Sequence, residues 1–139
     1  MTPLASALDR VGDRWSLLLV DALLESPLRF NELIDALPGI APNILTDRVR
    51  RLERTGIVRS VPYSQRPPRV EYTLTADGRD LAGALRLLAD WGGRRGAAGA
   101  EGDGDLHHAT CGTRLQARWY CPTCSVSVAD DEAADLPVL

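Results

Sequence analysis

The chain has 139 residues, contains no lysine and carries a formal net charge of −3. This length fits one modest domain with an appendage. No apolar run approaches the roughly 18 residues of a membrane span, and no basic, apolar leader opens the chain. We therefore expect a cytoplasmic protein without a signal peptide or a membrane partner.

The first third of the chain predicts three helices. The apolar spacing favours a short helix over residues 4–11 and a second helix from Trp15 to about Glu25, with Asp13 as its N-cap. Residues 28–30 read as a short extended piece that is able to pair with a later hairpin, and residues 31–37 follow as a third helix.

A fourth helix is predicted over residues 41–54, directly after a Pro-Gly turn. Leu45, Val49 and Leu52 recur at i, i+4 and i+7, which indicates one buried stripe. Gly56 is expected to end the helix in the left-handed conformation. The third and fourth helices together predict a helix-turn-helix.

The other face of the fourth helix carries hydrogen-bonding side chains at Asn43, Thr46, Asp47 and Arg50. Charge in this part of the chain is locally basic. Residues 43–69 hold seven arginines, at positions 48, 50, 51, 54, 59, 66 and 69, against the two acids Asp47 and Glu53, which gives +5. Residues 96–139 carry −5. A local excess of this size is able to neutralise several phosphates.

Two β-rich runs follow, over residues 57–63 and 69–74, joined by a Ser-Gln-Arg-Pro-Pro loop. Arg66 and Arg69 lie on either side of two prolines, whose fixed φ stiffens the tip. A helix-turn-helix followed by such a hairpin is the outline of a winged helix-turn-helix.

A last long helix is predicted after the cap residue Thr75, with Leu81, Leu85 and Leu88 on one stripe. The stripe forms either a dimer seam or a contact within its own domain. We expect the winged domain to span residues 1–92, a Gly/Ala/acidic linker 93–105, a second unit 106–128 and an acidic tail 129–139, helical around residues 130–135.

The second unit contains HHATCGTRLQARWYCPTC, in which His108 precedes Cys111 by three positions and Cys121 precedes Cys124 by three. Two such pairs supply the four ligands of a closed, tetrahedral structural Zn²⁺ site. Zinc contributes roughly 10–16 kcal/mol in comparable peptides. We therefore predict a zinc ribbon, with strands within residues 114–120.

Alternatives for this unit stay open. His107 is a second candidate for the histidine ligand, iron in a rubredoxin-like arrangement is a lesser alternative to zinc, and the segment is otherwise a metal-free thiol tail. With four protein ligands no coordination position is open for catalysis. The ribbon is then structural or a docking surface, although thiol oxidation offers a switch.

Four motifs occur in unbroken order over about residues 3–92: GDRWSLLLVDALLESPLRFNELIDALPGI, LTDRVRRLERTGIV, RPPRVEYTLTADGRDL and LADWG. They resemble the HxlR-type regulators, a branch close to the MarR-like winged-helix transcription factors. The resemblance implies homodimers joined through their first and last helices, palindromic operators and usually repression. It places the recognition helix at residues 41–54 and the wing at 63–69.

One position departs from the family pattern. Many members carry an oxidant-sensing cysteine just before the first helix, where this chain has Thr2. The resemblance therefore implies that this particular sensing route is closed.

For DNA, we expect Asn43, Thr46 and Arg50 to contact base edges in the major groove. Asp47 either accepts from a cytosine amino group or holds Arg50 or Arg51 in place. The remaining contacts are expected at phosphates, from Arg48, Arg51 and Arg54 on the helix and from Arg66 and Arg69 on the wing.

The sequence thus predicts a mainly α protein with a small β-hairpin wing and a C-terminal zinc-ribbon-like unit. No catalytic set competes with this interpretation, so we expect a homodimeric, sequence-specific repressor on double-stranded DNA, and no enzyme. The alternatives are a protein-interaction module that docks through the ribbon, and a metal- or redox-sensing regulator. A small-molecule inducer between the dimer helices is a further candidate partner, although no residue marks its site.

Overall fold

The computed structural model describes residues 1–95 and 106–133. The chain divides into two compact units, residues 1–86 and 87–139.

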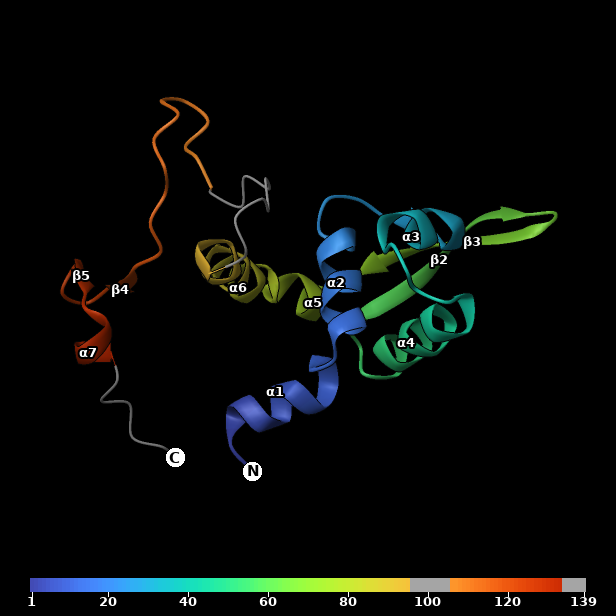
Figure 1. Cartoon of the computed structure of the whole chain (residues 1–139), viewed down its shortest axis with the longest axis horizontal. Helices are drawn as coiled ribbons and strands as arrows, with labels where there is room; N and C mark the ends of the chain where they lie inside the picture. The colour runs from blue at the N-terminus through green and yellow to red at the C-terminus, as the bar shows by residue number, and fades with distance from the viewer. Residues whose placement is uncertain (96–105, 134–139) are drawn as a thin grey trace. The chain divides into compact units, whose positions relative to one another are not determined.

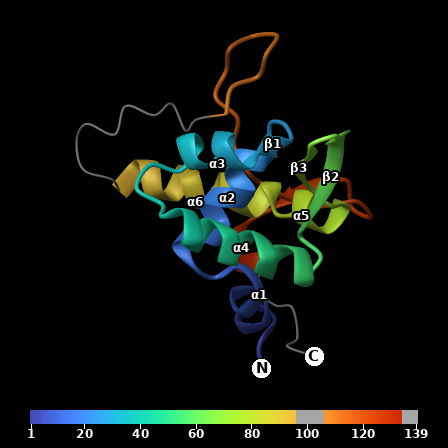
Figure 2. The ribbon, with the colours of Figure 1, turned by 90° about the vertical axis from the view of Figure 1, so that its right-hand side faces the viewer.

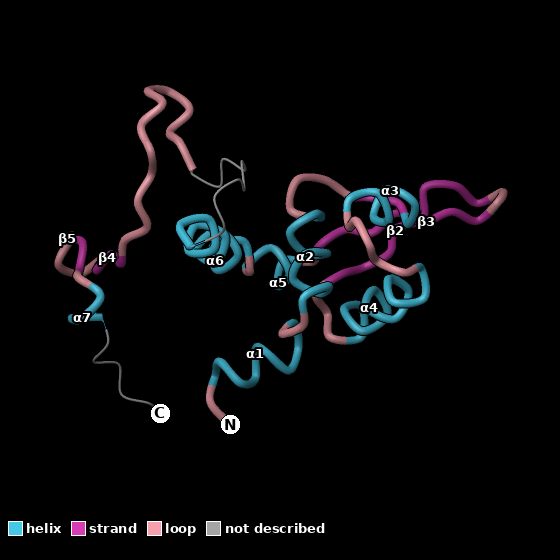
Figure 3. Tube along the Cα trace, viewed as in Figure 1, coloured by secondary structure: helices cyan, strands magenta, loops and turns pink. Residues whose placement is uncertain are grey.

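The first unit combines helices with a small antiparallel sheet (Figure 1, Figure 3). Its sheet has the strand order β1-β3-β2, and α4 packs against β2 and α2. In chain order the elements are α1 (Pro3–Val11), α2 (Arg14–Leu23), β1 (Leu28–Arg29), α3 (Phe30–Ala36), α4 (Pro42–Arg54), β2 (Val58–Gln65), β3 (Pro68–Leu74), α5 (Ala76–Asp80) and α6 (Ala82–Arg95), which continues into the second unit.

Side chains cap the first two helices. The Thr2 hydroxyl accepts a hydrogen bond from the Ala5 amide at 3.1 Å. The Asp13 carboxylate accepts from the Ser16 amide at 3.0 Å and from the Ser16 hydroxyl at 2.6 Å. Each cap pairs an amide that would otherwise lack a partner at a helix start. The prediction that Asp13 is an N-cap is confirmed.

Strand β1 pairs with β3, as the sequence suggested, with Leu28 opposite Tyr72. The β2–β3 hairpin is longer than expected. Its pairing continues to Gln65 opposite Pro68, so a two-residue turn replaces the predicted five-residue loop. The Arg66–Pro67 peptide bond in this turn is cis. Pro62 lies in β2, an edge strand of the sheet, where proline is tolerated.

The core lies between α2, α3, α4 and the sheet. Leu19, Leu33, Leu45 and Leu52 are completely buried. The predicted inner stripe of α4 is confirmed, since all three of its members are buried. Gly56 follows the helix with a φ of 74°, also as predicted, and its lack of a Cβ makes that conformation accessible.

The single long helix predicted after Thr75 is instead two helices. Thr75 caps α5 by accepting from the Gly78 amide at 3.1 Å, and the helix then breaks at Leu81 before α6 begins. Gly78 is buried so close to the sheet that a Cβ there would lie 2.3 Å from the Ile57 carbonyl oxygen. This close approach fixes α5 against the strands.

In the second unit, β4 (Trp119–Cys121) and β5 (Val126–Val128) form a short antiparallel hairpin, followed by α7 (Asp130–Ala133). Of the strands predicted over residues 114–120, the structure has the β4 residues Trp119 and Tyr120 and an isolated bridge between His107 and Arg114. Most of the predicted linker and the tail beyond residue 133 fall outside the described residues. Within the described part of the chain, no helix is long and apolar enough to cross a membrane.

Candidate nucleic-acid interface

Helix α4 exposes one polar stripe on the side away from its buried leucines. Asn43, Asp47, Arg50 and Arg54 are all exposed, at helical spacings of three and four residues. The view in Figure 2 shows α4 crossing the front of the unit, with the β2–β3 hairpin beside it. Among the described residues, Arg50 and Arg54 form no side-chain hydrogen bond or ion pair. Their guanidinium groups are available to an external acceptor.

Two other arginines of α4 point toward carboxylate and carbonyl groups of the preceding helices. Arg48 donates from Nε to Asp13 Oδ1 at 3.0 Å. Arg51 donates to the Asp9 carbonyl oxygen and lies 3.8 Å from Asp13 Oδ2. Both side chains are only a quarter to a third exposed. The structure therefore uses Arg48 and Arg51 to hold α4 against the α1–α2 junction.

The pKa of Asp13 reflects its contacts with Ser16 and Arg48. Burial alone would raise the pKa of the Asp13 carboxyl group, but hydrogen bonds from Ser16 and the charge of Arg48 outweigh that effect, so its pKa lies below the ordinary value of 3.8. Sequence reasoning found Asp13 as a helix cap and missed its second role. No local signal links it to an arginine in a later helix.

Thr46 and Asp47, two other polar residues of the predicted base-reading face, each bind a group of α4 itself. The Thr46 hydroxyl donates to the Pro42 carbonyl oxygen at 3.0 Å, one turn earlier in the helix. Asp47 meets Arg48 at 2.5 Å. The sequence had offered Arg50 or Arg51 as its partner, and neither pairing is found in the part of the chain that the structure describes.

The wing places Arg66 in the hairpin turn and Arg69 on β3 next to it. Both residues are exposed. At the base of the wing, the Arg29 guanidinium stacks over the Tyr63 ring, 4.4 Å from its centroid. This cation–π contact joins the hairpin to the start of α3. The hairpin and α4 thus present exposed arginines on separate elements of one unit.

The predicted metal ligands form two pairs. His108 Nδ1 lies 3.3 Å from Cys111 Sγ, and the Cys124 amide donates to Cys121 Sγ at 3.5 Å. Hydrogen bonding with Thr113 and with His108 lowers the pKa of Cys111 to about 7, and hydrogen bonding with Cys124 lowers the pKa of Cys121. Within the described residues, no three His, Cys, Asp or Glu side chains gather closely enough to hold one ion.

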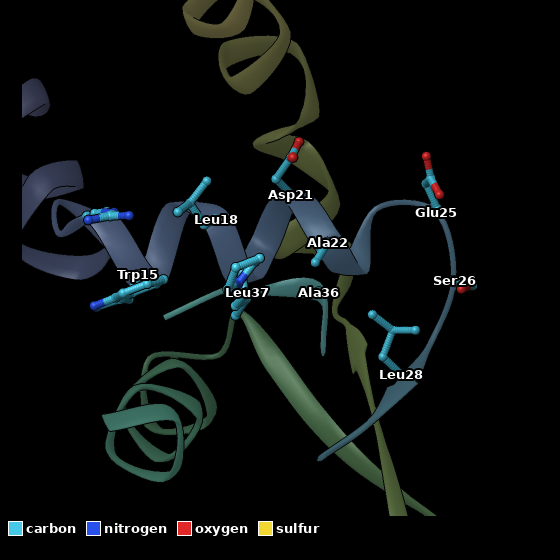
Figure 4. Close-up of a pocket in the computed structure, with 11 residues that line it drawn as sticks. Trp15, Leu18, Asp21, Ala22, Glu25, Ser26, Leu28, Ala36 and Leu37 are labelled. Carbon is cyan, nitrogen blue, oxygen red and sulfur yellow. The ribbon is translucent and has the colours of Figure 1, made fainter. Parts of the chain in front are cut away.

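An open groove of about 640 Å³ runs beside α2 and α3. Figure 4 shows Trp15, Ala22 and Leu37 along it, with Leu28 across from them. The volume is in the range of small-molecule sites. This groove lies within the winged unit, whereas the sequence had placed an inducer between the helices of a dimer.

A helix-turn-helix of α3 and α4, a hairpin wing and exposed arginines on both define a winged-helix DNA-binding regulator. Comparison with known proteins agrees. The profile of the HxlR-like helix-turn-helix family matches residues 10–99, and the chain belongs to this family of transcriptional regulators.

Relatives of known sequence or structure extend the comparison. The HTH-type transcriptional regulator Mb3122 of Mycobacterium bovis is 37% identical over 122 residues, which cover 88% of this chain and 77% of that protein. The redox regulator HypR in its reduced form is 36% identical with a TM-score of 0.64, over 67% of this chain and 92% of HypR. The crystal structure of PA1607 is 31% identical with a TM-score of 0.77, over 94% of this chain and 90% of PA1607.

Proposed function

We propose that this protein is a homodimeric repressor that binds a palindromic operator through α4 and the β2–β3 wing. The observation that carries the proposal is the exposed stripe of α4, on which Arg50 and Arg54 form no side-chain hydrogen bond or ion pair among the described residues. A guanidinium group that pairs with no carboxylate of its own chain is able to form bidentate hydrogen bonds with a phosphate or with the edge of a guanine base.

Base readout is assigned to Asn43, Thr46 and Arg50. Asn43 is exposed in the first turn of α4, which is the part of a recognition helix that enters the major groove deepest. Because the Thr46 hydroxyl proton is engaged with Pro42, Thr46 offers a methyl group and an acceptor oxygen. Arg50 fits guanine, and a bidentate contact discriminates by about 1–3 kcal/mol.

Phosphate contacts are assigned first to Arg54 on the helix and to Arg66 and Arg69 on the wing, all exposed. Arg48 and Arg51 remain candidates for phosphate contact, although each already binds groups at the α1–α2 junction. Asp47, paired with Arg48, is assigned to orienting that arginine.

Dimerisation is assigned to α1 and α6, because both helices expose large apolar side chains. Leu4 is 69% exposed and Leu8 51%, while Leu87, Leu88 and Trp91 are 46%, 50% and 54% exposed. Exposed apolar side chains grouped on a helix are candidates for a contact between subunits. A two-fold dimer then places two α4 helices about 34 Å apart, in successive major grooves.

The test is selection of random duplexes on the full-length protein, followed by binding measurements on the enriched sequence. We expect a palindromic motif. Arg50→Ala should reduce discrimination among bases at one position of each half-site. Arg66→Ala should weaken binding to all sequences and lower the salt dependence. Arg118→Ala, which removes the same charge outside the winged unit, serves as the control.

Two results would overturn the assignment. If Arg50→Ala and Arg66→Ala change affinity and base preference identically, the separate roles are wrong. If the protein shows no retention on random duplex DNA at moderate salt, the winged unit does not bind DNA, and the alternative of a protein-interaction module replaces the proposal.

A second candidate function is a regulator that senses metal or oxidants, favoured by the contact between His108 and Cys111. Here operator affinity should change when a chelator or a thiol oxidant is added. Unchanged affinity in both conditions eliminates this candidate without affecting the DNA-binding proposal.

A further inference from the structure

The described side chains between residues 106 and 132 form no hydrophobic core. Where burial is described between residues 106 and 132, Cys121 and Val128 are half-buried and the other residues are exposed. The Mb3122 match covers 122 residues, more than precede Leu106, so the similarity to that relative continues into this unit. A segment this short without buried apolar groups needs another source of stability, such as a bound metal.

Cys111 contacts His108, its partner in the first of the two predicted ligand pairs. Gly112 follows it with a φ of 70°, and the Gly112 amide donates to the His108 carbonyl oxygen at 2.8 Å. Bonds of about 2.0 Å to nitrogen and 2.3 Å to sulfur at a tetrahedral Zn²⁺ place the two ligand atoms roughly 3.5 Å apart. His108 Nδ1 and Cys111 Sγ are 3.3 Å apart, so this pair has the separation that one ion requires.

The second pair lies in the turn between β4 and β5. Cys121 ends β4, and the Cys124 amide donates to its sulfur at 3.5 Å. Ser125 follows with a φ of 56°, which corresponds to the left-handed residue after the first pair. Both pairs therefore share the same spacing and the same backbone reversal directly after the second ligand.

We propose that His108, Cys111, Cys121 and Cys124 bind one Zn²⁺ per chain as a closed structural site. Each pair contributes two ligands, and the ion draws the two pairs together across the segment 112–120, because the structure by itself does not gather three of these donors. Three cysteines cannot all be satisfied by disulfides, whereas one ion takes all three as thiolates together with a neutral imidazole.

The experiment uses the full-length protein. Metal analysis should give one zinc per chain. After removal with a chelator, Co²⁺ should restore one equivalent with the ligand-field absorption of a tetrahedral site and a thiolate-to-cobalt charge-transfer band. His108→Ala and each of Cys111→Ser, Cys121→Ser and Cys124→Ser should lose this tight binding against a competing chelator. His107→Ala is the matched control and should keep it.

Several outcomes overturn the proposal. These are a protein that takes up no metal, a stoichiometry other than one per chain, a wild-type cobalt spectrum in any of the four ligand variants, and loss of the spectrum in His107→Ala. Because the readout is metal binding, a failure of operator binding leaves this test unaffected, and the reverse also holds.

Discussion

Substitutions at Asp13 measure how strongly α4 is held against the α1–α2 junction. Asp13→Ala removes the cap of α2, which costs about 1 kcal/mol. It also removes the charge-assisted hydrogen bond from Arg48, at 3.0 Å and partly exposed, which we put at about 1 kcal/mol. The free energy of unfolding, measured by urea titration, should therefore fall by about 2 kcal/mol.

Asp13→Asn separates the two contributions, because asparagine is also a good N-cap but carries no charge. It should cost about half as much as Asp13→Ala. The pKa of Asp13 lies below 3.8 in the folded chain. Stabilisation by its charge is therefore present above pH 3.8 and is lost as the pH falls through the folded pKa. The gap between wild type and Asp13→Asn should narrow in that range.

Three results contradict this reasoning. They are an Asp13→Asn variant as unstable as Asp13→Ala, a gap between wild type and Asp13→Asn that stays constant into strong acid, and a double-mutant cycle with Arg48→Ala that shows no coupling between the two residues.

Further predictions concern packing. Gly78→Ala should destabilise the fold strongly or prevent folding, because the added Cβ would lie 2.3 Å from the Ile57 carbonyl oxygen. At the control position Gly83 an added Cβ would have nothing within 4 Å. Gly83→Ala should therefore stabilise the fold by roughly 0.4–1 kcal/mol and raise the thermal midpoint. Leu52→Ala should lower the free energy of unfolding by about 2–5 kcal/mol, because Leu52 is completely buried; a smaller loss in urea titration would contradict the tight packing of α4. Leu87→Ala should leave monomer stability nearly unchanged and weaken the proposed dimer in sedimentation experiments, since its side chain is 46% exposed.

The sequence predicted a structural feature correctly where a local pattern of residues is compatible with only one arrangement. The stripe of Leu45, Val49 and Leu52 identified the inner face of α4, because residues at this spacing all lie on the same side of a helix. Thr75 was recognised as a cap for a similar reason. The break after α5 was not predicted, because helical periodicity carries no information about contacts with distant segments, such as the close approach of Gly78 to the Ile57 carbonyl group.

The count of charged residues likewise contains no information about contacts between distant parts of the chain. Counting arginines correctly located a basic region, but it could not separate those that hold the helix from those that face outward. Of the two carboxylates that pair with Arg48, that of Asp13 lies 35 positions earlier. In the C-terminal unit, spacing predicted the two ligand pairs; His108 contacts Cys111 and Cys124 contacts Cys121, metal binding stays a prediction, and the strands are shorter than expected.

Some polar residues of α4 hold the helix in place and others are exposed, and this difference is useful for engineering. Arg48 and Arg51 hold the helix against the α1–α2 junction, whereas Asn43 and Arg50 are exposed and form no side-chain hydrogen bond or ion pair among the described residues. Libraries varied at these two outward positions should therefore yield regulators with new operator preferences while the scaffold keeps its stability.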